Sequence, residues 1–82
     1  MQTSHTFKLT IALVNELLFS GEVHSVTVPG SEGELTILAK HQPLITILKK
    51  GTIVVRTAEE TKEFVITKGL LETSNGQVTI LV

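Results

Sequence analysis

The chain has 82 residues and a mass of 8.9 kDa, which is enough for one domain and not for two. Hydrophobic residues make up 41% of it and charged residues only 18%, so we expect a folded chain, because disorder needs low hydrophobicity and high net charge. Seven Lys and Arg residues against eight acids give a formal charge of −1, which supplies no positive field for a nucleic-acid backbone. Nucleic acid is therefore excluded as a partner.

Several chemically important residue types are missing. The sequence contains no Cys, Asp, Trp or Tyr, which excludes disulfides, zinc–thiolate sites, a Ser-His-Asp triad and aromatic stacking platforms. His5, His24 and His41 lack the spacing that would bring two imidazoles to one metal ion. We therefore expect no enzyme activity and no catalytic, cofactor-binding or metal-binding residues.

The N-terminal region is apolar but does not read as a targeting segment. Asn15 and Glu16 interrupt the apolar run over residues 9–19, and no stretch approaches the ~20 apolar residues that span a bilayer. We expect a mature, soluble protein without direct membrane insertion.

Apolar and polar residues alternate along most of the chain, which is typical of strands with one buried face. In chain order, the alternating segments are residues 7–13, 26–28, 35–37, 53–55, 64–66 and 78–82. Residues 12–19, between the first two, favour a bulge or corner over a turn of helix. Of the connections, Lys49-Lys50-Gly51 is interpreted as a hairpin turn, and Asn75-Gly76 has the residues of a type I′ turn.

Composition agrees with this pattern. Val, Ile and Thr account for 28 residues and Ala for three, a balance that favours strands over helices. The sequence predicts an all-β fold of about eight to ten short strands, arranged as a small two-sheet β-sandwich or flattened barrel. Without repeats or linkers, residues 1–82 are expected to form a single domain.

Five apolar residues break the alternation by falling on the face predicted to meet solvent: Val14, Leu38, Val54, Val65 and Leu81. One explanation is a central strand that is covered on both sides. The other is an exposed apolar patch that docks a partner, because monomers rarely leave such patches bare. The sequence leaves both open.

A glycine-rich segment, Gly30-Ser31-Glu32-Gly33-Glu34, superficially resembles a phosphate-binding loop. Its two carboxylates would repel an anion, so a turn between strands is favoured, and any partner would be cationic or polar. His41 is the most constrained histidine because Pro43 restricts the chain beside it.

Three elements occur in order along this chain: Phe19-Ser20-Gly21, Gly30-Ser31-Glu32-Gly33-Glu34-Leu35 and His41-Gln42-Pro43-Leu44-Ile45-Thr46. They resemble the elements "F-S-G", "G-S-E-G-E-L" and "H-x-P-L-L-T", which occur in this order in the N-terminal domain of the epsilon subunit of F-type ATP synthases. Weaker matches at residues 48–51, 68–72 and 78–81 extend the resemblance over essentially the whole chain.

The resemblance implies a non-catalytic subunit of the central stalk, or rotor, of a proton- or ion-translocating complex that couples ion flow to ATP synthesis. It implies a rotor-ring interface at Ser31, Glu32 and Glu34, and a gamma-subunit interface at His41, Pro43 and Leu44. The implied location is the cytoplasmic face of the bacterial inner membrane, peripheral through the complex, with no cofactor.

The chain also departs from the family. Ala39-Lys40 stands where the family usually has Pro-Gly, Lys50 replaces a turn proline, and Lys68 replaces a glycine. Family members usually continue into a two-helix extension that binds ATP and inhibits hydrolysis, so without it we expect coupling but not this inhibition. The alternative function is a free-standing β-sandwich that binds a ligand or acts in adhesion.

Overall fold

The computed structural model describes residues 5–40 and 42–82, and these residues form nine β-strands. The strands are β1 (Phe7–Leu13), β2 (Glu16–Val23), β3 (Ser25–Gly30), β4 (Gly33–Leu38), β5 (Leu44–Leu48), β6 (Gly51–Arg56), β7 (Thr61–Ile66), β8 (Gly69–Ser74) and β9 (Gln77–Leu81). Within these ranges no helix is long and apolar enough to cross a membrane. The predicted all-β class is confirmed.

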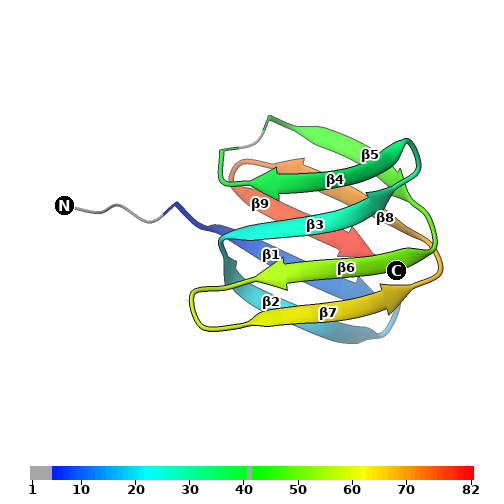
Figure 1. Cartoon of the computed structure of the whole chain (residues 1–82), viewed down its shortest axis with the longest axis horizontal. Helices are drawn as coiled ribbons and strands as arrows, with labels where there is room; N and C mark the ends of the chain where they lie inside the picture. Colours follow the sequence, from blue (N-terminus) through cyan, green and yellow to red (C-terminus); the bar gives the residue numbers. More distant parts are fainter. Residues whose placement is uncertain (1–4, 41) are drawn as a thin grey trace.

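The strands lie in two layers that face each other (Figure 1). The front layer has the order β4-β3-β6-β7, and the back layer has the order β2-β1-β9-β8-β5. A single pair, Gly30 of β3 with Leu48 of β5, joins them into one hydrogen-bonded path. β1 and β9 run parallel, and every other pair is antiparallel. This arrangement confirms the predicted β-sandwich.

The core lies between the layers because alternate side chains of both layers point inward. Its buried members are Phe7, Leu9, Ile11, Val23, Val26, Val28, Ile37, Leu48, Ile53, Val55, Ile66, Leu71, Val78 and Ile80. Between the edge strands β2 and β7, Phe19 and Phe64 meet edge to face, with ring centroids 6.2 Å apart. Lys62 Nζ lies 5.7 Å from the centroid of the Phe19 ring. These three side chains cover part of that flank of the core.

Two local predictions are confirmed. Asn75 and Gly76 have φ values of 51° and 76°, as the type I′ turn between β8 and β9 requires. The pairing of β1 with β2 shifts between Ile11 and Ala12, which places a bulge at the beginning of the ambiguous segment.

The hairpin predicted at Lys49-Lys50-Gly51 is wrong. β5 pairs with β8 and β3, whereas β6 pairs with β3 and β7, so this connection crosses from one layer to the other. The crossing is tight, since a Cβ on Gly51 would lie 2.7 Å from Cβ of Pro29. Alternation of period two tells which residues face the core, but it does not tell which strand is the neighbour.

The depth of the core predicts a difference between two identical substitutions. Val55→Ala removes methyl groups from a side chain that is 0% exposed, while Val65→Ala removes them from one that is 80% exposed. We expect Val55→Ala to lower the free energy of unfolding by about 2 kcal/mol and Val65→Ala by less than about 0.5 kcal/mol. Urea unfolding measures both, and equal losses would contradict the packing described above.

Candidate docking surface

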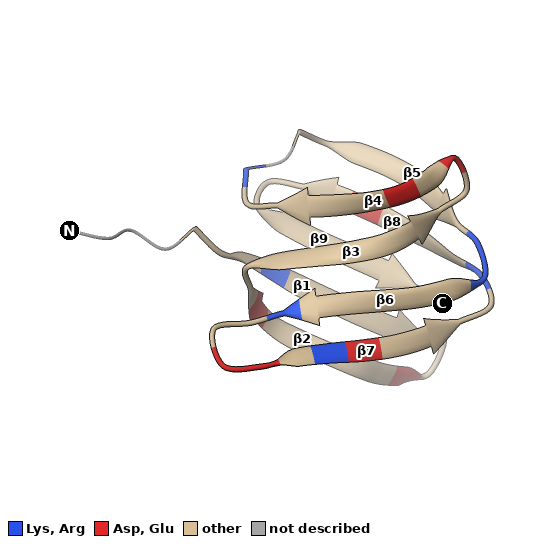
Figure 2. Cartoon of the chain, in the orientation of Figure 1, with Lys and Arg blue, Asp and Glu red and all other residues tan. Residues whose placement is uncertain are grey.

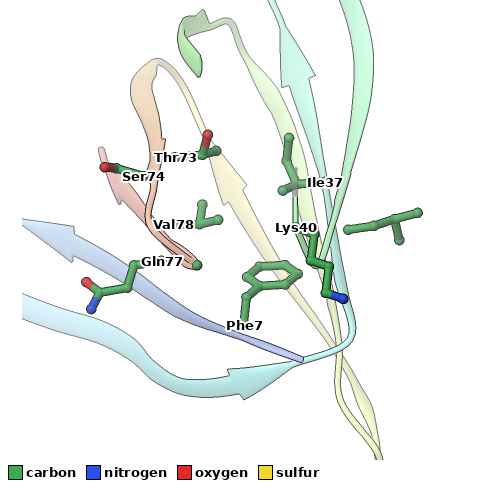
Figure 3. A pocket seen from close by; sticks show the side chains of 9 residues that line it. Phe7, Ile37, Lys40, Thr73, Ser74, Gln77 and Val78 are labelled. Carbon is green, nitrogen blue, oxygen red and sulfur yellow. The ribbon is translucent and has the colours of Figure 1, made fainter. Parts of the chain in front are cut away.

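The interior offers no room for a substrate at the hollow shown in Figure 3. Phe7, Ile37, Lys40 and Val78 are among its lining residues, and its volume is about 10 Å³. A space of this size holds about one water molecule. Among the residues that the structure describes, no group of three or more His, Cys, Asp or Glu residues could hold a metal ion.

A continuous line of apolar residues crosses the outer face of the back layer. Strand pairing places Ile47 beside Leu70, Leu70 beside Leu81, Leu81 beside Ala12, and Ala12 beside Leu17. Paired residues share a face and lie about 5 Å apart, so these five residues, here called the apolar row, form one surface. Ile47, Leu70, Leu81 and Leu17 are 63%, 40%, 50% and 60% exposed.

The apolar row lies at one end of that face and gives way to polar residues toward the other end. The adjacent row contains Ile45, Glu72, Thr79, Thr10 and Ser20, and only Ile45 among them is apolar. The next row contains Ser74, Gln77, Lys8 and Glu22. Exposed apolar groups are therefore concentrated at the end where β1, β5 and β9 finish.

The outer face of the front layer has a different character. Arg56 Nη1 donates to Thr27 Oγ1 over 3.0 Å, and the hydroxyls of Thr27 and Thr36 lie 2.9 Å apart. Leu38 and Val65 are exposed on this face, but they are at opposite ends of the outer strands β4 and β7. They do not form a row.

The five residues that broke the sequence alternation therefore have separate outcomes. Val14, Leu38, Val65 and Leu81 are exposed, so coverage on both sides does not explain them. Val54, on the central strand β6, is half-buried. Of the five, only Leu81 belongs to the apolar row.

The acidic turn lies at the same end as the apolar row. Ser31 and Glu32 form the turn between β3 and β4, and Glu34 follows near the start of β4. The Ser31 amide donates to the Ile47 carbonyl oxygen over 2.9 Å, which attaches this turn to the strand that carries the apolar row. Ser31 and both Glu residues are exposed (Figure 2 shows the Glu residues in red beside the label of β5).

The second predicted set lies elsewhere. Pro43 and Leu44 are at the opposite end of β5, so the structure does not bring them together with the acidic turn. Pro43 is exposed beside Ile45, whereas Leu44 is partly buried against the core. Thr73 Oγ1 donates to the Gln42 carbonyl oxygen over 2.9 Å and holds the connection that precedes Pro43 against β8. His41 lies outside the described residues.

Sequence reasoning missed most of the apolar row. Ile45 and Ile47 occur in the nearly continuous apolar segment of β5, and Leu70 occurs in a Leu-Leu pair of β8. These apolar runs were the signal that could have revealed the row. A strand with apolar residues on both faces is either buried on both sides or has an exposed apolar face.

The fold is a two-layer β-sandwich whose outer surface combines an apolar row with charged turns. The chain belongs to the family described as ATP synthase, Delta/Epsilon chain, beta-sandwich domain, whose sequence model matches residues 6–82. The resemblance stated from the sequence motifs is confirmed.

Curated relatives and solved structures agree with this assignment. The chain is 40% identical over 75 residues to "ATP synthase epsilon chain 2" of Nitrobacter hamburgensis, covering 92% of this chain and 55% of the relative. It is 44% identical over 78 residues to "ATP synthase epsilon chain" of Nitratiruptor sp., covering 94% and 60%. The chain thus spans between 55% and 60% of the length of these two relatives.

A chain in the mitochondrial ATP synthase of Euglena gracilis, solved as OSCP/F1/c-ring, superposes with a TM-score of 0.89 at 25% identity, covering 100% of this chain and 53% of that one. A chain from the central stalk and c-ring of the Tetrahymena thermophila mitochondrial enzyme shares the fold, with a TM-score of 0.80 at 18% identity, covering 99% and 66%.

The acidic turn predicts a second difference between matched substitutions. A Cβ on Gly30 would lie 2.7 Å from the Gly33 carbonyl oxygen, whereas a Cβ on Gly21 would meet only the Phe19 ring, at 3.7 Å. We expect Gly30→Ala to lower the free energy of unfolding by about 1 to 3 kcal/mol and Gly21→Ala to change it by less than about 1 kcal/mol. Thermal or urea unfolding of both variants decides the matter. Equal free energies of unfolding for the two variants would contradict the close contact described at Gly30.

Proposed function

We propose that residues 1–82 act as one docking domain in the central stalk of an F-type ATP synthase, where they bind the gamma subunit and the membrane rotor ring. The domain makes and breaks no bonds. It stiffens the joint so that rotation of the ring and rotation of gamma stay coupled, and ion flow thereby drives ATP synthesis. The observation that carries this proposal is the apolar row beside the acidic turn.

The apolar row is the proposed gamma contact. Its exposed Ile and Leu side chains form a contiguous apolar line on an otherwise polar sheet face, which is the composition of an interface center. Ile45 continues this surface along β5 toward Pro43, and a hollow of about 360 Å³ lined by Pro43, Leu44, Ile45 and Glu72 lies there. The predicted gamma residues His41, Pro43 and Leu44 would then extend the contact toward the other end of β5.

The acidic turn is the proposed ring contact. Ser31, Glu32 and Glu34 present exposed oxygen atoms that suit polar or cationic loops. Two backbone hydrogen bonds brace this turn, from Ser31 N to Ile47 O and from Lys49 N to Pro29 O, both 2.9 Å long. A force applied at the turn therefore reaches β5 directly, and β5 carries part of the gamma contact.

Location follows from the same proposal. A domain held between gamma and the ring is peripheral to the membrane, at the cytoplasmic face of a bacterial inner membrane. The alternative of a sugar-binding module lacks support, because Phe19 and Phe64 face each other instead of forming an open platform.

Charge placed on the apolar row tests the gamma contact. Ile47→Glu introduces a carboxylate into the row, and Val65→Glu introduces one on the front layer at a site that is 80% exposed. Burying an unpaired charge is costly, so we expect Ile47→Glu to weaken binding to the cognate gamma subunit by about tenfold or more and Val65→Glu to leave it unchanged. Titration followed by size-exclusion chromatography measures this. Separate elution of the unmodified chain would instead favour the free-standing module.

Removal of the carboxylates tests the ring contact. We expect the double variant Glu32→Ala/Glu34→Ala to elute with gamma as the unmodified chain does, because neither residue belongs to the apolar row. Binding to a purified complex of gamma with the rotor ring should weaken by about threefold or more, from the loss of two exposed polar contacts. We expect His41→Ala to weaken binding to gamma and to leave the ring contact intact. Loss of gamma binding in the double variant would contradict the assignment of the two surfaces.

A further inference from the structure

Two connections that cross between the layers run side by side at the end that carries the acidic turn. β5 passes to β6 through Lys49 and Lys50, and β7 passes to β8 through Thr67 and Lys68. The last pairs that flank them are Leu48 with Gly69 and Gly51 with Ile66. The ladders stop at these pairs, so Lys49 and Lys50 of one crossing lie between the same two flanking pairs as Thr67 and Lys68 of the other.

These crossings concentrate positive charge. Lys49, Lys50 and Lys68 are all exposed, and they are half of the six lysines in the chain. Within the described residues, 5–40 and 42–82, the only ion pair is that of Lys62 Nζ with Glu60 Oε2, which lie 3.7 Å apart. The three ammonium groups therefore lie on two adjacent crossings, and no described carboxylate lies within 4.0 Å of them.

The acidic turn is fixed directly beside this basic cluster. The hydrogen bond from Lys49 N to Pro29 O, 2.9 Å long, ties the first crossing to the strand that leads into the turn. At the right-hand side of Figure 2, the red acidic turn lies above the blue crossings. Glu32 and Glu34 form no ion pair with these lysines in the described structure. One end of the molecule thus presents a negative band and a positive band, each available to a partner.

We propose that the basic cluster, defined as Lys49, Lys50 and Lys68, docks on carboxylate side chains of the same partner that receives Glu32 and Glu34. This inference rests on the proposed function, in which that partner is the rotor ring. The ring loops must then carry acidic residues as well as cationic or polar ones, because the two bands are adjacent and opposite in sign. Lys50 and Lys68 are two of the positions at which the sequence motifs depart from the family pattern, and the match is proposed for this chain and its own ring.

The test compares two double variants that change the net charge equally. Lys50→Gln/Lys68→Gln removes charge from the basic cluster, and Lys8→Gln/Lys40→Gln removes it from exposed sites at the opposite end. Each is titrated against the purified cognate complex of gamma with the rotor ring, at low and at high salt. We expect the first variant to bind about fivefold more weakly at low salt, from the loss of two exposed ion pairs. Its affinity should also depend less on salt, and the control should bind as the unmodified chain does.

The affinities from this titration and one further measurement keep the outcomes apart. Equal affinities of the two double variants, with normal binding of the unmodified chain, would overturn the inference and leave the proposed function intact. Failure of the unmodified chain to bind the ring complex would overturn the proposed function itself. Lipid headgroups are the other source of negative charge that these lysines could bind. Sedimentation of the chain with vesicles of anionic phospholipid measures that binding. Vesicle binding lost in Lys50→Gln/Lys68→Gln, with ring binding unchanged, would assign the cluster to lipid and overturn the inference.

Discussion

The junction between β3 and β5 is the constraint on which the functional surface depends. One residue pair, Gly30 with Leu48, joins the two layers, and the backbone hydrogen bonds of Ser31 and Lys49 reinforce it on either side. A Cβ at position 30 would lie 2.7 Å from the Gly33 carbonyl oxygen, so the backbone would have to shift to admit any other residue. The acidic turn, the first basic crossing and the end of the apolar row all begin within a few residues of this junction.

In the proposed function, this arrangement would let a small domain serve two partners. The proposed gamma contact needs an apolar face, which the back layer provides across all five of its strands. The proposed ring contact needs charged groups on a firm support, which the turns at the same end provide. A sandwich has few internal degrees of freedom because its core is tightly packed. Both proposed partners would therefore bear on one stiff body, as the proposed mechanical coupling requires.

The sequence was sufficient for the fold class and for several local details. Alternation identified the inward face of strands such as β1 and β9, and Asn75-Gly76 identified a turn whose chemistry is purely local. The crossing at Lys49 and Lys50 could not be predicted, because strand neighbours are set by long-range packing and not by the period of the pattern. The order of three motifs indicated the family, and the match of the family model to residues 6–82 confirmed that resemblance.

The proposed docking surface was harder to predict from the sequence. Ile47, Leu70 and Leu81 lie on three different strands, and only the register of two ladders reveals that they are neighbours. Ser31, Glu32 and Glu34 were selected by the resemblance, and their position beside β5 required the structure. Pro43 and Leu44 were selected in the same way, and their distance from the acidic turn was not foreseen.

The central claim, that gamma covers the apolar row, can be tested most directly by thiol labelling. The chain contains no cysteine, so Leu70→Cys and Val65→Cys each introduce a single reporter, the first in the apolar row and the second on the other layer. The labelling rate of each variant is measured with and without the cognate gamma subunit. Our account predicts that gamma strongly slows labelling at position 70 and leaves position 65 unaffected. Protection at position 65 alone, or at neither position in a complex that has formed, would contradict it.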